Sequence, residues 1–440
     1  MTFLHIGFDD TDSPSGGCTT YLCARLVEVL STLNVNFIDY PLLIRLNPNV
    51  PFRTRGNAAL CLRIEIDGSF ENKVKQIILE EIERGAHLSF KNTNPGVVFY
   101  EGETIPPILE KFSKKAMQNI VIINEALKMA ETVGAGICTF KNARGVIGAL
   151  AAIGTLLKND HTYELITYRT PENYGKRRNL DINSIRNMDS ITAPNTFCNL
   201  DNGRILITPH GADPILYGIR GDSAEIVYAA HKMVIPIEPI ERWVIFRSNQ
   251  GTDMHLQFLA SISQVRPYLS VILDGEVSNK PKTISGGHVI VQIKDNTGSI
   301  DCAAYEPTGE FREVIKSLIP GDRVRVYGGV RPASSLHPLT VNLEKMEILK
   351  LAPLVANSNP KCTKCGKRMT SAGKNKGFKC KKCKLKLTDI EKSTFEISRN
   401  IAEKLYLPPP RAHRHLTRPK ERINKLAKKS ETMFKPWHYP

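Results

Sequence analysis

The chain opens with the stretch TFLHIGFDDTDSPSGGCTTYLCARLVEVLSTL, residues 2–33, and its pattern sets the expected fold of the N-terminal part. Thr2–Asp9 is a β-like run that ends in carboxylates. Gly16 and Gly17 mark a loop, and apolar residues recur at helical spacing over Tyr21–Leu33. This stretch therefore predicts a strand, a polar loop and a helix that follows directly.

The pattern continues with two more strand-like runs, Asn36–Leu46 and Ala58–Ile66, and a helical run at Val74–Ile82. The order β-α-β-β-α indicates an α+β catalytic domain over residues 1–118. A second α+β domain, which we interpret as ferredoxin-like, is expected over residues 119–240. It begins with a helix at Asn119–Thr132, followed by a glycine-rich segment and several short strands, and the glycines are Gly134, Gly136, Gly145, Gly148 and Gly154.

Residues 264–351 change to short strands separated by glycine turns. One helix, Phe311–Leu318, is expected between the third and fourth strands. Five strands with a helix in that place outline an OB-fold β-barrel, which binds single-stranded nucleic acid through one face and its loops. The expected strands are Ser270–Ser278, His288–Asp295, Ser299–Tyr305, Arg323–Val330 and Thr340–Leu349.

Two Cys-x-x-Cys pairs, Cys362/Cys365 and Cys380/Cys383, lie in residues 360–390. Two such pairs present four thiolates to one tetrahedral Zn²⁺, and a module this small needs the ion to fold. A redox Cys-x-x-Cys would be a single pair on a βαβ fold. We therefore expect a structural zinc ribbon, followed by a basic C-terminal tail, 391–440, that is ordered in part only when RNA binds.

The net charge of +16 predicts a polyanionic partner because clustered cations gain free energy by releasing phosphate counterions. The surplus is concentrated, with eleven Lys or Arg and no acid over 361–388, and this distribution favours nucleic acid. No apolar run approaches the length of a membrane helix, and Met1–Gly7 has no signal-peptide character. We expect a cytoplasmic protein that does not enter a membrane.

Three carboxylates, Asp9, Asp10 and Asp12, follow the first strand within four residues. They repel one another unless they share a cation such as Mg²⁺, which prefers oxygen ligands and bridges to nucleotide phosphates. The loop then carries Gly16, Gly17 and Thr20 to a helix N-terminus, where free N–H groups can hold phosphate. Taken alone, such a segment is more often a plain turn and cap, but the combination predicts an ATP site that is not a Walker A motif.

Other candidate binding residues are Arg45, Arg53 and Arg55, which can stabilise a transferring phosphoryl group or hold an RNA backbone. A cationic amine needs carboxylates for its charge. Asp189, Asp201, Asp213 and Asp222 are candidates by type, although each alone is more often a turn residue or a helix cap.

Four segments in this order resemble the archaeal family of isoleucine-tRNA 2-agmatinylcytidine synthetases: Gly7–Asp12 with Gly17–Thr20, Arg45–Asn57, Asn92–Gly96 and His210–Gly221. The similarity covers essentially the whole chain, since an OB-fold and a zinc ribbon follow in the family's order. It implies a threonine and cytidine kinase domain, a ferredoxin-like domain, ATP and agmatine as substrates, an isoleucine tRNA with the CAU anticodon as partner, and no obligate protein partner.

The resemblance implies an ATP-dependent ligase that activates the 2-oxo group of the wobble cytidine by phosphorylation and replaces it with agmatine, so that the codon AUA is read. It assigns Asp9, Asp10 and Asp12 to Mg²⁺ and ATP, and autophosphorylation to Thr19, with Thr20 the second choice. For agmatine it leaves Asp189 and Asp213 as candidates.

Two other functions compete with this one. A non-enzymatic single-stranded nucleic-acid-binding protein needs only the OB-fold, the ribbon and the tail, and leaves the first 240 residues unexplained. A kinase or ligase acting on a small molecule leaves the basic C-terminal third unexplained.

Overall fold

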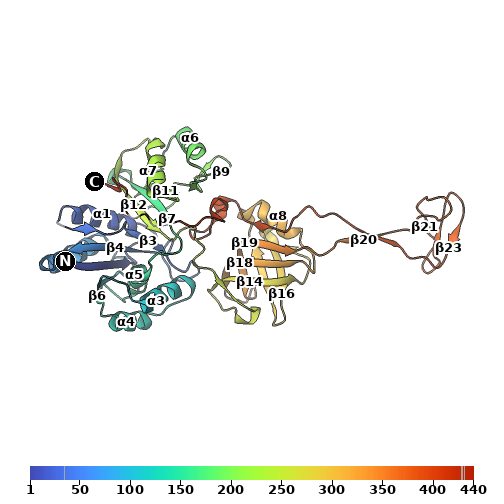
Figure 1. Ribbon diagram of the computed structural model, residues 1–440, viewed down its shortest axis with the longest axis horizontal. Coiled ribbons are helices and arrows are strands. Elements are labelled where there is room, and N and C mark those ends of the chain that lie inside the picture. Colours follow the sequence, from blue (N-terminus) through green and yellow to red (C-terminus); the bar gives the residue numbers. More distant parts are fainter. Residues whose placement is uncertain (34, 428–429, 431) are drawn as a thin grey trace.

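The computed structural model describes residues 1–33, 35–427, 430 and 432–440. Figure 1 shows three parts along the longest axis: a broad α+β part that holds both termini, a β-barrel beside it, and a small module at the far end of a thin two-stranded arm. The multidomain α+β fold expected from the sequence is confirmed, with the OB-fold and the zinc ribbon in the expected order. The predicted domain limits, 1–118, 119–240, 264–351, 360–390 and 391–440, stay predictions.

The α+β part is built on one continuous sheet with the strand order β6-β5-β1-β4-β3-β12-β7-β11-β8. Two further strands join it, since β2 pairs with β4 and β26 with β12. The strands are β1 (Thr2–Asp9), β2 (Asn36–Phe37), β3 (Leu42–Arg45), β4 (Ala58–Ile66), β5 (Gly96–Glu101), β6 (Gly136–Thr139), β7 (Thr162–Arg169), β8 (Thr196–Phe197), β11 (Ile215–Gly221), β12 (Ile240–Ser248) and β26 (His438–Tyr439).

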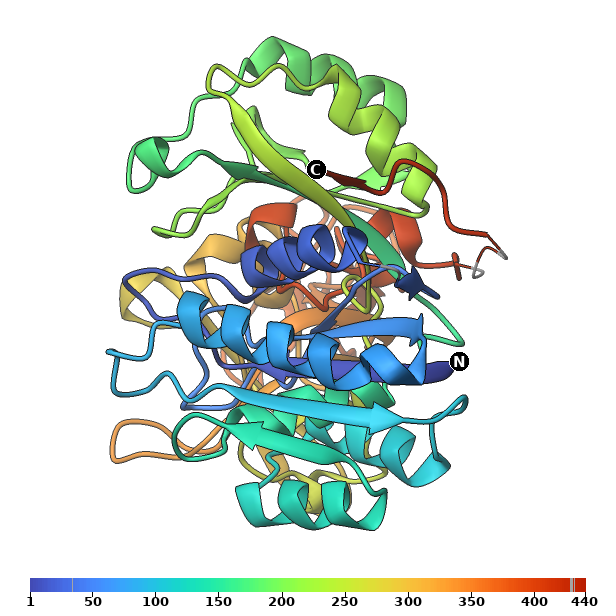
Figure 2. The ribbon, with the colours of Figure 1, turned by 90° about the vertical axis from the view of Figure 1, so that its left-hand side faces the viewer.

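Helices cover both faces of this sheet. Figure 2 shows the α+β part viewed along the longest axis of Figure 1. One apolar core joins α1, α2, α6 and α7 to the sheet, and a second joins α3, α4 and α5 to its other face. The helices are α1 (Thr19–Ser31), α2 (Glu71–Gly85), α3 (Pro107–Gln118), α4 (Ile123–Thr132), α5 (Gly145–Gly154), α6 (Ile182–Thr192) and α7 (Ala224–Met233). A two-stranded ribbon of β9 (Leu200–Asp201) and β10 (Arg204–Ile205) lies beside the main sheet.

The two halves of the sheet meet where β3 pairs in parallel with β12, through Leu42↔Arg247 and Leu43↔Ser248. The strand expected over residues 36–46 is interrupted here. Pro41 has no N–H to give to a ladder, and its carbonyl oxygen instead accepts the Arg247 N–H at 3.0 Å. The interruption turns β3 away from β2 and onto the neighbouring half.

The glycine-rich segment contains a helix, α5, that the sequence did not predict. Gly145, Gly148 and Gly154 disfavour a helix by propensity, but here they allow close packing. A Cβ on Gly148 would lie 2.6 Å from Cγ of Asp9, and one on Gly145 would lie 2.7 Å from the Asp9 carbonyl oxygen. Burial against the end of β1 therefore outweighs the low helix propensity of glycine.

The middle part is a closed barrel in which β14, β18, β19, β17 and β16 pair in turn and β16 returns to β14. Helix α8 lies between the third and fourth strands, as expected for an OB-fold. The elements are β13 (Gln257–Phe258), β14 (Ser270–Val277), β15 (Lys282–Thr283), β16 (Val289–Lys294), β17 (Ser299–Ala304), α8 (Glu310–Lys316), β18 (Arg323–Arg331) and β19 (Thr340–Lys350).

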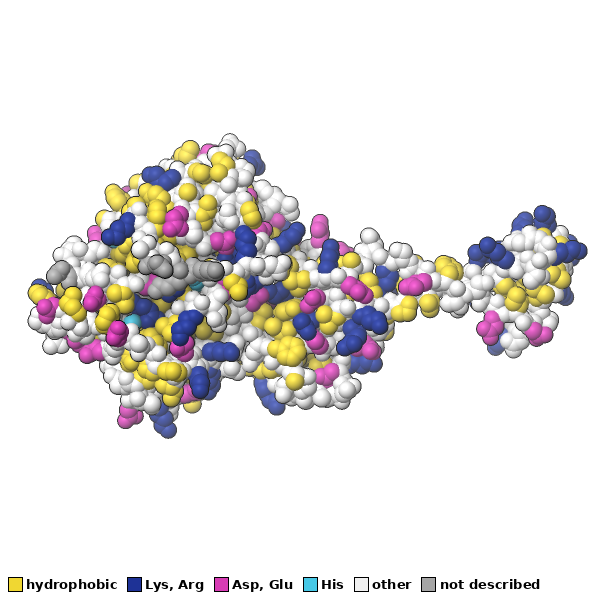
Figure 3. All heavy atoms as spheres, in the orientation of Figure 1, with side chains coloured by type: hydrophobic (Ala, Val, Ile, Leu, Met, Phe, Trp, Pro, Cys, Tyr) yellow, Lys and Arg dark blue, Asp and Glu magenta, His cyan; other side chains and the backbone are white. Residues whose placement is uncertain are grey.

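The small terminal module stands on an arm formed by β20 (Val355–Ser358) and β24 (Ser393–Glu396). It contains β21 (Thr370–Ser371), β22 (Phe378–Lys379) and β23 (Lys386–Leu387). Figure 3 shows lysine and arginine side chains gathered on its surface.

The C-terminal segment is not a free tail, and the prediction of partial disorder is wrong for its described residues. From here we call residues 405–440 the strap. Its β25 (Leu405–Tyr406) pairs with β19, and β26 pairs with β12 of the main sheet. Between them Arg422 is fully buried and contacts Asp160, at 2.7 Å, and Asp222. These two carboxylates lie 262 and 200 residues away from Arg422 in sequence, and composition alone cannot reveal them.

Within the described residues, no helix is long and apolar enough to cross a bilayer.

Gly148→Ala is expected to destabilise the protein by about 1–3 kcal/mol, because an added methyl group overpacks the contact with Asp9. This result is opposite to the usual gain from replacing glycine by alanine in a helix. Thermal unfolding measures it. The matched control is Gly136→Ala in β6, where the added Cβ would have its nearest contact at 3.9 Å. A Gly148→Ala protein that melts at or above the wild-type temperature would contradict the close packing of α5.

Candidate active site

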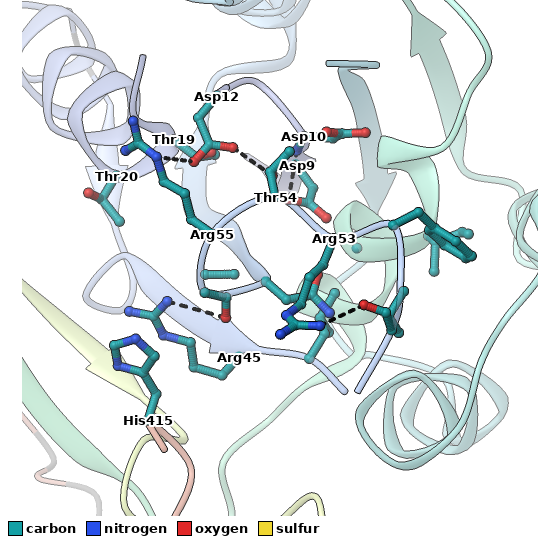
Figure 4. Close-up of a pocket in the computed structure, with 18 of the residues that line it drawn as sticks. Asp9, Asp10, Asp12, Thr19, Thr20, Arg45, Arg53, Thr54, Arg55 and His415 are labelled. Atoms are coloured by element: carbon teal, nitrogen blue, oxygen red, sulfur yellow. Dashed lines mark hydrogen bonds and ion pairs between the residues drawn. The ribbon is translucent and has the colours of Figure 1, made fainter. Parts of the chain in front are cut away.

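A cavity of about 580 Å³ opens where the two halves of the sheet meet. The end of β1, the start of α1, the loop after β3, the start of α5, the loop before β11 and the strap all contribute to its wall. Figure 4 shows Asp12 beside Arg55, and Arg45 beside His415. The polar side chains that line it include Asp9, Asp10, Asp12, Thr19, Thr20, Arg45, Arg53, Arg55, Asp213 and His415.

The three carboxylates lie together because β1 ends at Asp9 and the chain turns sharply at Asp10, which has φ of +62°. Asp9 accepts the Asp10 N–H at 2.6 Å. Asp10 accepts a hydrogen bond from Nε of Arg144 at 2.8 Å, and Asp12 accepts one from the Thr54 hydroxyl at 2.8 Å. These partners compensate the cluster only in part.

Burial dominates the acid–base properties of this cluster. It raises the pKa of Asp9 well above its usual range, and the neighbouring Asp10 charge raises it further. Burial raises the pKa of Asp10 to about 6 against the opposing charge of Arg144, and it raises the pKa of Asp12 against the Thr54 hydrogen bond and Arg55. Buried carboxylates that resist ionisation are suited to share a divalent cation, which restores their charged form.

Thr19 and Thr20 form the first residues of α1, as the phosphate-binding prediction requires. Cys18, at the N-cap, makes no side-chain capping hydrogen bond, so the helix dipole and the N–H groups of the first turn are available to an anion. The Thr11 hydroxyl donates to Oγ1 of Thr19 at 3.0 Å. This contact orients the Thr19 hydroxyl at the edge of the acidic cluster.

The two loop glycines lie behind the cavity and are not among the residues that line it. Gly17 has φ of +74°, and a Cβ there would come within 3.3 Å of Cα of Asp12. Gly16 lies against His87, whose ring bonds the Ser13 hydroxyl at 2.7 Å. These glycines shape the turn between the acids and α1.

All three predicted arginines line the cavity. Nε of Arg45 donates to Gln250 at 3.2 Å, and Arg53 donates to the Val50 carbonyl at 2.8 Å. Arg55 lies between two carboxylates, with Asp12 and Asp213 each at 3.6 Å. Arg55 thus connects the acidic cluster of the first half to an acid of the second.

The two aspartates proposed for an amine occupy different places. Asp213 is buried, lines the cavity and also pairs with Arg178 at 3.1 Å. Asp189 lies on α6, accepts a hydrogen bond from Asn199 at 2.9 Å, and is not among the residues that line the cavity.

Sequence reasoning missed two polar side chains of this wall, Arg144 and His415. Arg144 precedes the unpredicted helix α5, and His415 belongs to the strap, so neither carried a local signal. Both reach the cavity through tertiary packing.

The four ribbon cysteines converge as predicted. The sulfur atoms of Cys362, Cys365, Cys380 and Cys383 all lie within 4.8 Å of one another. Backbone N–H groups, that of Cys383 first, lower the pKa of Cys380 to about 6. Four converging thiols with one thiolate favoured at neutral pH fit a tetrahedral Zn²⁺.

Sequence models of four domain families match this chain in order. They are the TiaS TCKD domain over residues 5–142, the TiaS FLD domain over 143–255, the OB-fold nucleic acid binding domain over 271–349 and the TiaS C-terminal zinc ribbon domain over 359–401.

Curated relatives match over nearly their whole length. The isoleucine-tRNA 2-agmatinylcytidine synthetase TiaS of Methanosarcina mazei is 43% identical over 424 residues, which cover 94% of this chain and 96% of the relative. The enzyme of the same name from Pyrococcus horikoshii is 44% identical over 418 residues, with 94% and 96% covered.

Solved structures of TiaS also match this chain over nearly its whole length. The crystal structure of TiaS in complex with its isoleucine tRNA and ATP matches with a TM-score of 0.86 and 39% identity, and covers 98% of this chain and 99% of that one. The complex of TiaS with the same tRNA, AMPCPP and agmatine matches with a TM-score of 0.84 and 37% identity, with 98% and 99% covered. This chain belongs to the TiaS family of isoleucine-tRNA 2-agmatinylcytidine synthetases.

Proposed function

We propose that this chain is an ATP-dependent ligase that joins agmatine to the wobble cytidine of the isoleucine tRNA with the CAU anticodon. The observation that carries the proposal is one cavity that holds an acidic cluster, a helix N-terminus with Thr19, and Asp213 from the second half of the sheet. Phosphoryl transfer needs the first two, and a guanidinium-bearing amine needs a carboxylate. Relatives crystallised with an isoleucine tRNA, ATP and agmatine support these three substrates.

The reaction needs activation because the 2-oxo group of cytosine is a poor leaving group. Transfer of a phosphoryl group from ATP to that oxygen breaks a P–O bond of the triphosphate and turns the 2-oxo group into a good leaving group. The amine of agmatine then forms a bond to C2, loses a proton, and the phosphorylated oxygen departs with its bonding electrons as phosphate. For this the cytidine has to leave its base stack and enter the cavity, as in other enzymes that modify bases.

The acidic cluster would hold Mg²⁺ through Asp9, Asp10 and Asp12. When bound, Mg²⁺ neutralises phosphate oxygens during transfer. The N–H groups at the start of α1 would bind phosphate, with Gly16 and Gly17 shaping the turn before them, and Arg45, Arg53 and Arg55 would balance the charge that develops. Thr19 would be the hydroxyl that accepts a phosphoryl group, oriented by Thr11 at 3.0 Å.

Asp213 would bind the guanidinium of agmatine. Its carboxylate pairs with the guanidinium groups of Arg178 at 3.1 Å and Arg55 at 3.6 Å, which is the kind of contact that agmatine would make. Asp189 is less suited to this role because it lies outside the cavity wall.

The barrel and the zinc ribbon would bind the remainder of the tRNA. Splayed bases of an anticodon loop can be read directly, and the ribbon lysines would contact phosphates. A purely nucleic-acid-binding protein has no use for the buried carboxylates beside Thr19, which argues against that alternative.

Incorporation of labelled agmatine into an unmodified transcript of the isoleucine tRNA with the CAU anticodon tests the function. The zinc-loaded protein, ATP and Mg²⁺ are expected to give a labelled product, and each omission abolishes it. Changing the wobble cytidine to uridine is also expected to abolish the product. A folded protein that binds the transcript and gives no product would favour a binding function or another amine.

Thr19→Ala is expected to reduce agmatine incorporation at least tenfold while the affinity for the tRNA stays within twofold. Product formation falls because the change removes the hydroxyl that would accept a phosphoryl group. The affinity for the tRNA is kept because the change removes no cation that could contact an RNA phosphate. Thr32→Ala, at the exposed C-terminal end of α1, is the matched control. Parallel losses of affinity and product would assign Thr19 a structural role.

Mg²⁺ is expected to raise the melting temperature by several degrees at pH 7.5 and hardly at pH 5. The folded-state pKa of Asp10 is raised to about 6, so the unfavourable burial of its charge is present above pH 6 and is relieved by protonation as the pH falls. Mg²⁺ competes with protons for the same oxygens. Asp10→Asn should remove the response, and an equal response at both pH values would contradict Mg²⁺ binding by these carboxylates.

A further inference from the structure

A second cavity, of about 280 Å³, lies between the second half of the sheet and the strap. Four arginines line it: Arg220 comes from β11 of the sheet, Arg204 from the β9–β10 ribbon beside the sheet, and Arg411 and Arg414 from the strap. Among the described residues that form its wall there is no aspartate or glutamate. We call it the cationic cavity.

The carboxylates that pair with three of these arginines do not line the cavity. Arg204 makes no ion pair with a carboxylate among the described residues; its guanidinium contacts the ring of His210 at 3.1 Å. The cavity surface therefore keeps a positive charge and suits an anion. The compensated pairs are Arg220–Glu164 at 3.1 Å, Arg411–Asp201 at 2.7 Å and Arg414–Glu344 at 3.5 Å.

The cationic cavity adjoins the cavity of about 580 Å³ that forms the candidate active site, which we call the reaction cavity. His415 lines both, and it also lines a smaller cavity of about 170 Å³ that lies between them. Arg220 donates to Nδ1 of His415 at 2.9 Å, and the charge of Arg45 on the other side, followed by burial, lowers the pKa of His415 well below its usual range. A neutral imidazole thus separates the cationic cavity from the reaction cavity without adding charge.

The position of the cavity indicates which anion it takes. Arg414 reaches Asn49 of the reaction-cavity loop at 2.7 Å and Glu344 in β19 of the barrel. The cavity therefore lies where an RNA strand would pass from the reaction cavity towards the barrel. The phosphates of ATP would instead belong beside Thr19 and the acidic cluster, on the other side of His415.

We propose that the cationic cavity binds one of the two phosphates that flank the reacting cytidine, and so fixes which base of the loop enters the reaction cavity. This inference rests on the proposed function. Phosphate contacts set the register of a bound strand without reading its sequence. The strap would then take part in choosing the modified position, although it lies far along the chain from the acidic cluster.

Binding of anticodon stem-loop RNA tests the proposal without any need for catalysis. Fluorescence anisotropy gives Kd for the wild type and Arg204→Gln on a stem-loop with the CAU anticodon and on versions with one methylphosphonate at each loop position. Arg204→Gln should weaken binding about tenfold, a typical effect of losing one charged hydrogen bond. The wild type and Arg204→Gln should bind equally well only to an RNA whose methylphosphonate replaces a phosphate beside the wobble cytidine. In that RNA the charge that Arg204 would contact is already absent.

The matched control is Arg186→Gln. Arg186 is an exposed arginine on α6, the helix that packs on the same half of the sheet, and it does not line the cavity. It should leave every Kd within twofold, and both variants should melt as the wild type does. Arg411→Gln is the second variant and should repeat the pattern of Arg204→Gln.

Three outcomes would overturn the inference: no loss of affinity, the same loss on every methylphosphonate RNA, or coupling to a distant phosphate. A separate measurement of ATP affinity should show no change in the variants, and a parallel loss there would assign the cavity to nucleotide phosphate. If the wild type binds the stem-loop and incorporates agmatine but shows no coupling, this inference alone fails. If it does neither, the proposed function fails as well.

Discussion

The parallel pairing of β3 with β12 is the constraint on which the remaining structure depends. Only two residue pairs form it, Leu42↔Arg247 and Leu43↔Ser248, yet it makes one sheet out of two α+β halves. The buried ion pair between Arg247 and Asp39, at 2.6 Å, ties the junction further. Because strands are stiff, this junction sets the distance between the end of β1 and the start of β11, and the reaction cavity lies between them.

Chemistry and stability oppose each other at the end of β1. Three carboxylates approach one another in a buried place, which raises the pKa of each and costs free energy whenever they ionise. The scaffold tolerates this because α5 has glycine at the contact, so that the helix can approach Asp9. The same glycines lower the intrinsic stability of helix α5, because glycine has a low helix propensity. Local stability is therefore lowered twice in the same place, and both losses serve the geometry of the acids.

Local patterns predicted the elements that depend on local physics. Thr2–Asp9 and Ala58–Ile66 are strands with the expected bounds, and the five barrel strands follow their alternating patterns. The four cysteines converge because their spacing allows one arrangement around an ion. Each of these signals is contained in a short stretch, so a sequence can reveal it without knowledge of the fold.

What the sequence could not reveal depends on contacts between distant segments. Helix α5 forms because its glycines are buried against β1, a stabilisation that helix propensity does not contain. Asp189 and Asp213 were equivalent as isolated aspartates, and only the fold separates them. The strap looked like a disordered tail because its basic composition was visible and its buried partner, Asp160, was not.

The path of the chain after the barrel explains how a zinc ribbon at the end of an arm can coexist with a strap that contributes to the candidate active site. The chain leaves the barrel along β20, forms the ribbon, returns along β24 and then rejoins β19 through β25. The ribbon is thus an insertion on a two-stranded arm, and the pairing of β25 with β19 separates it from the strap. The strap begins only after the chain is anchored to the barrel again, and it carries His415 into the reaction cavity. The pairing of β25 with β19 fixes the chain to the barrel before the strap begins, so the wall of the reaction cavity depends on the barrel and the sheet and not on the ribbon.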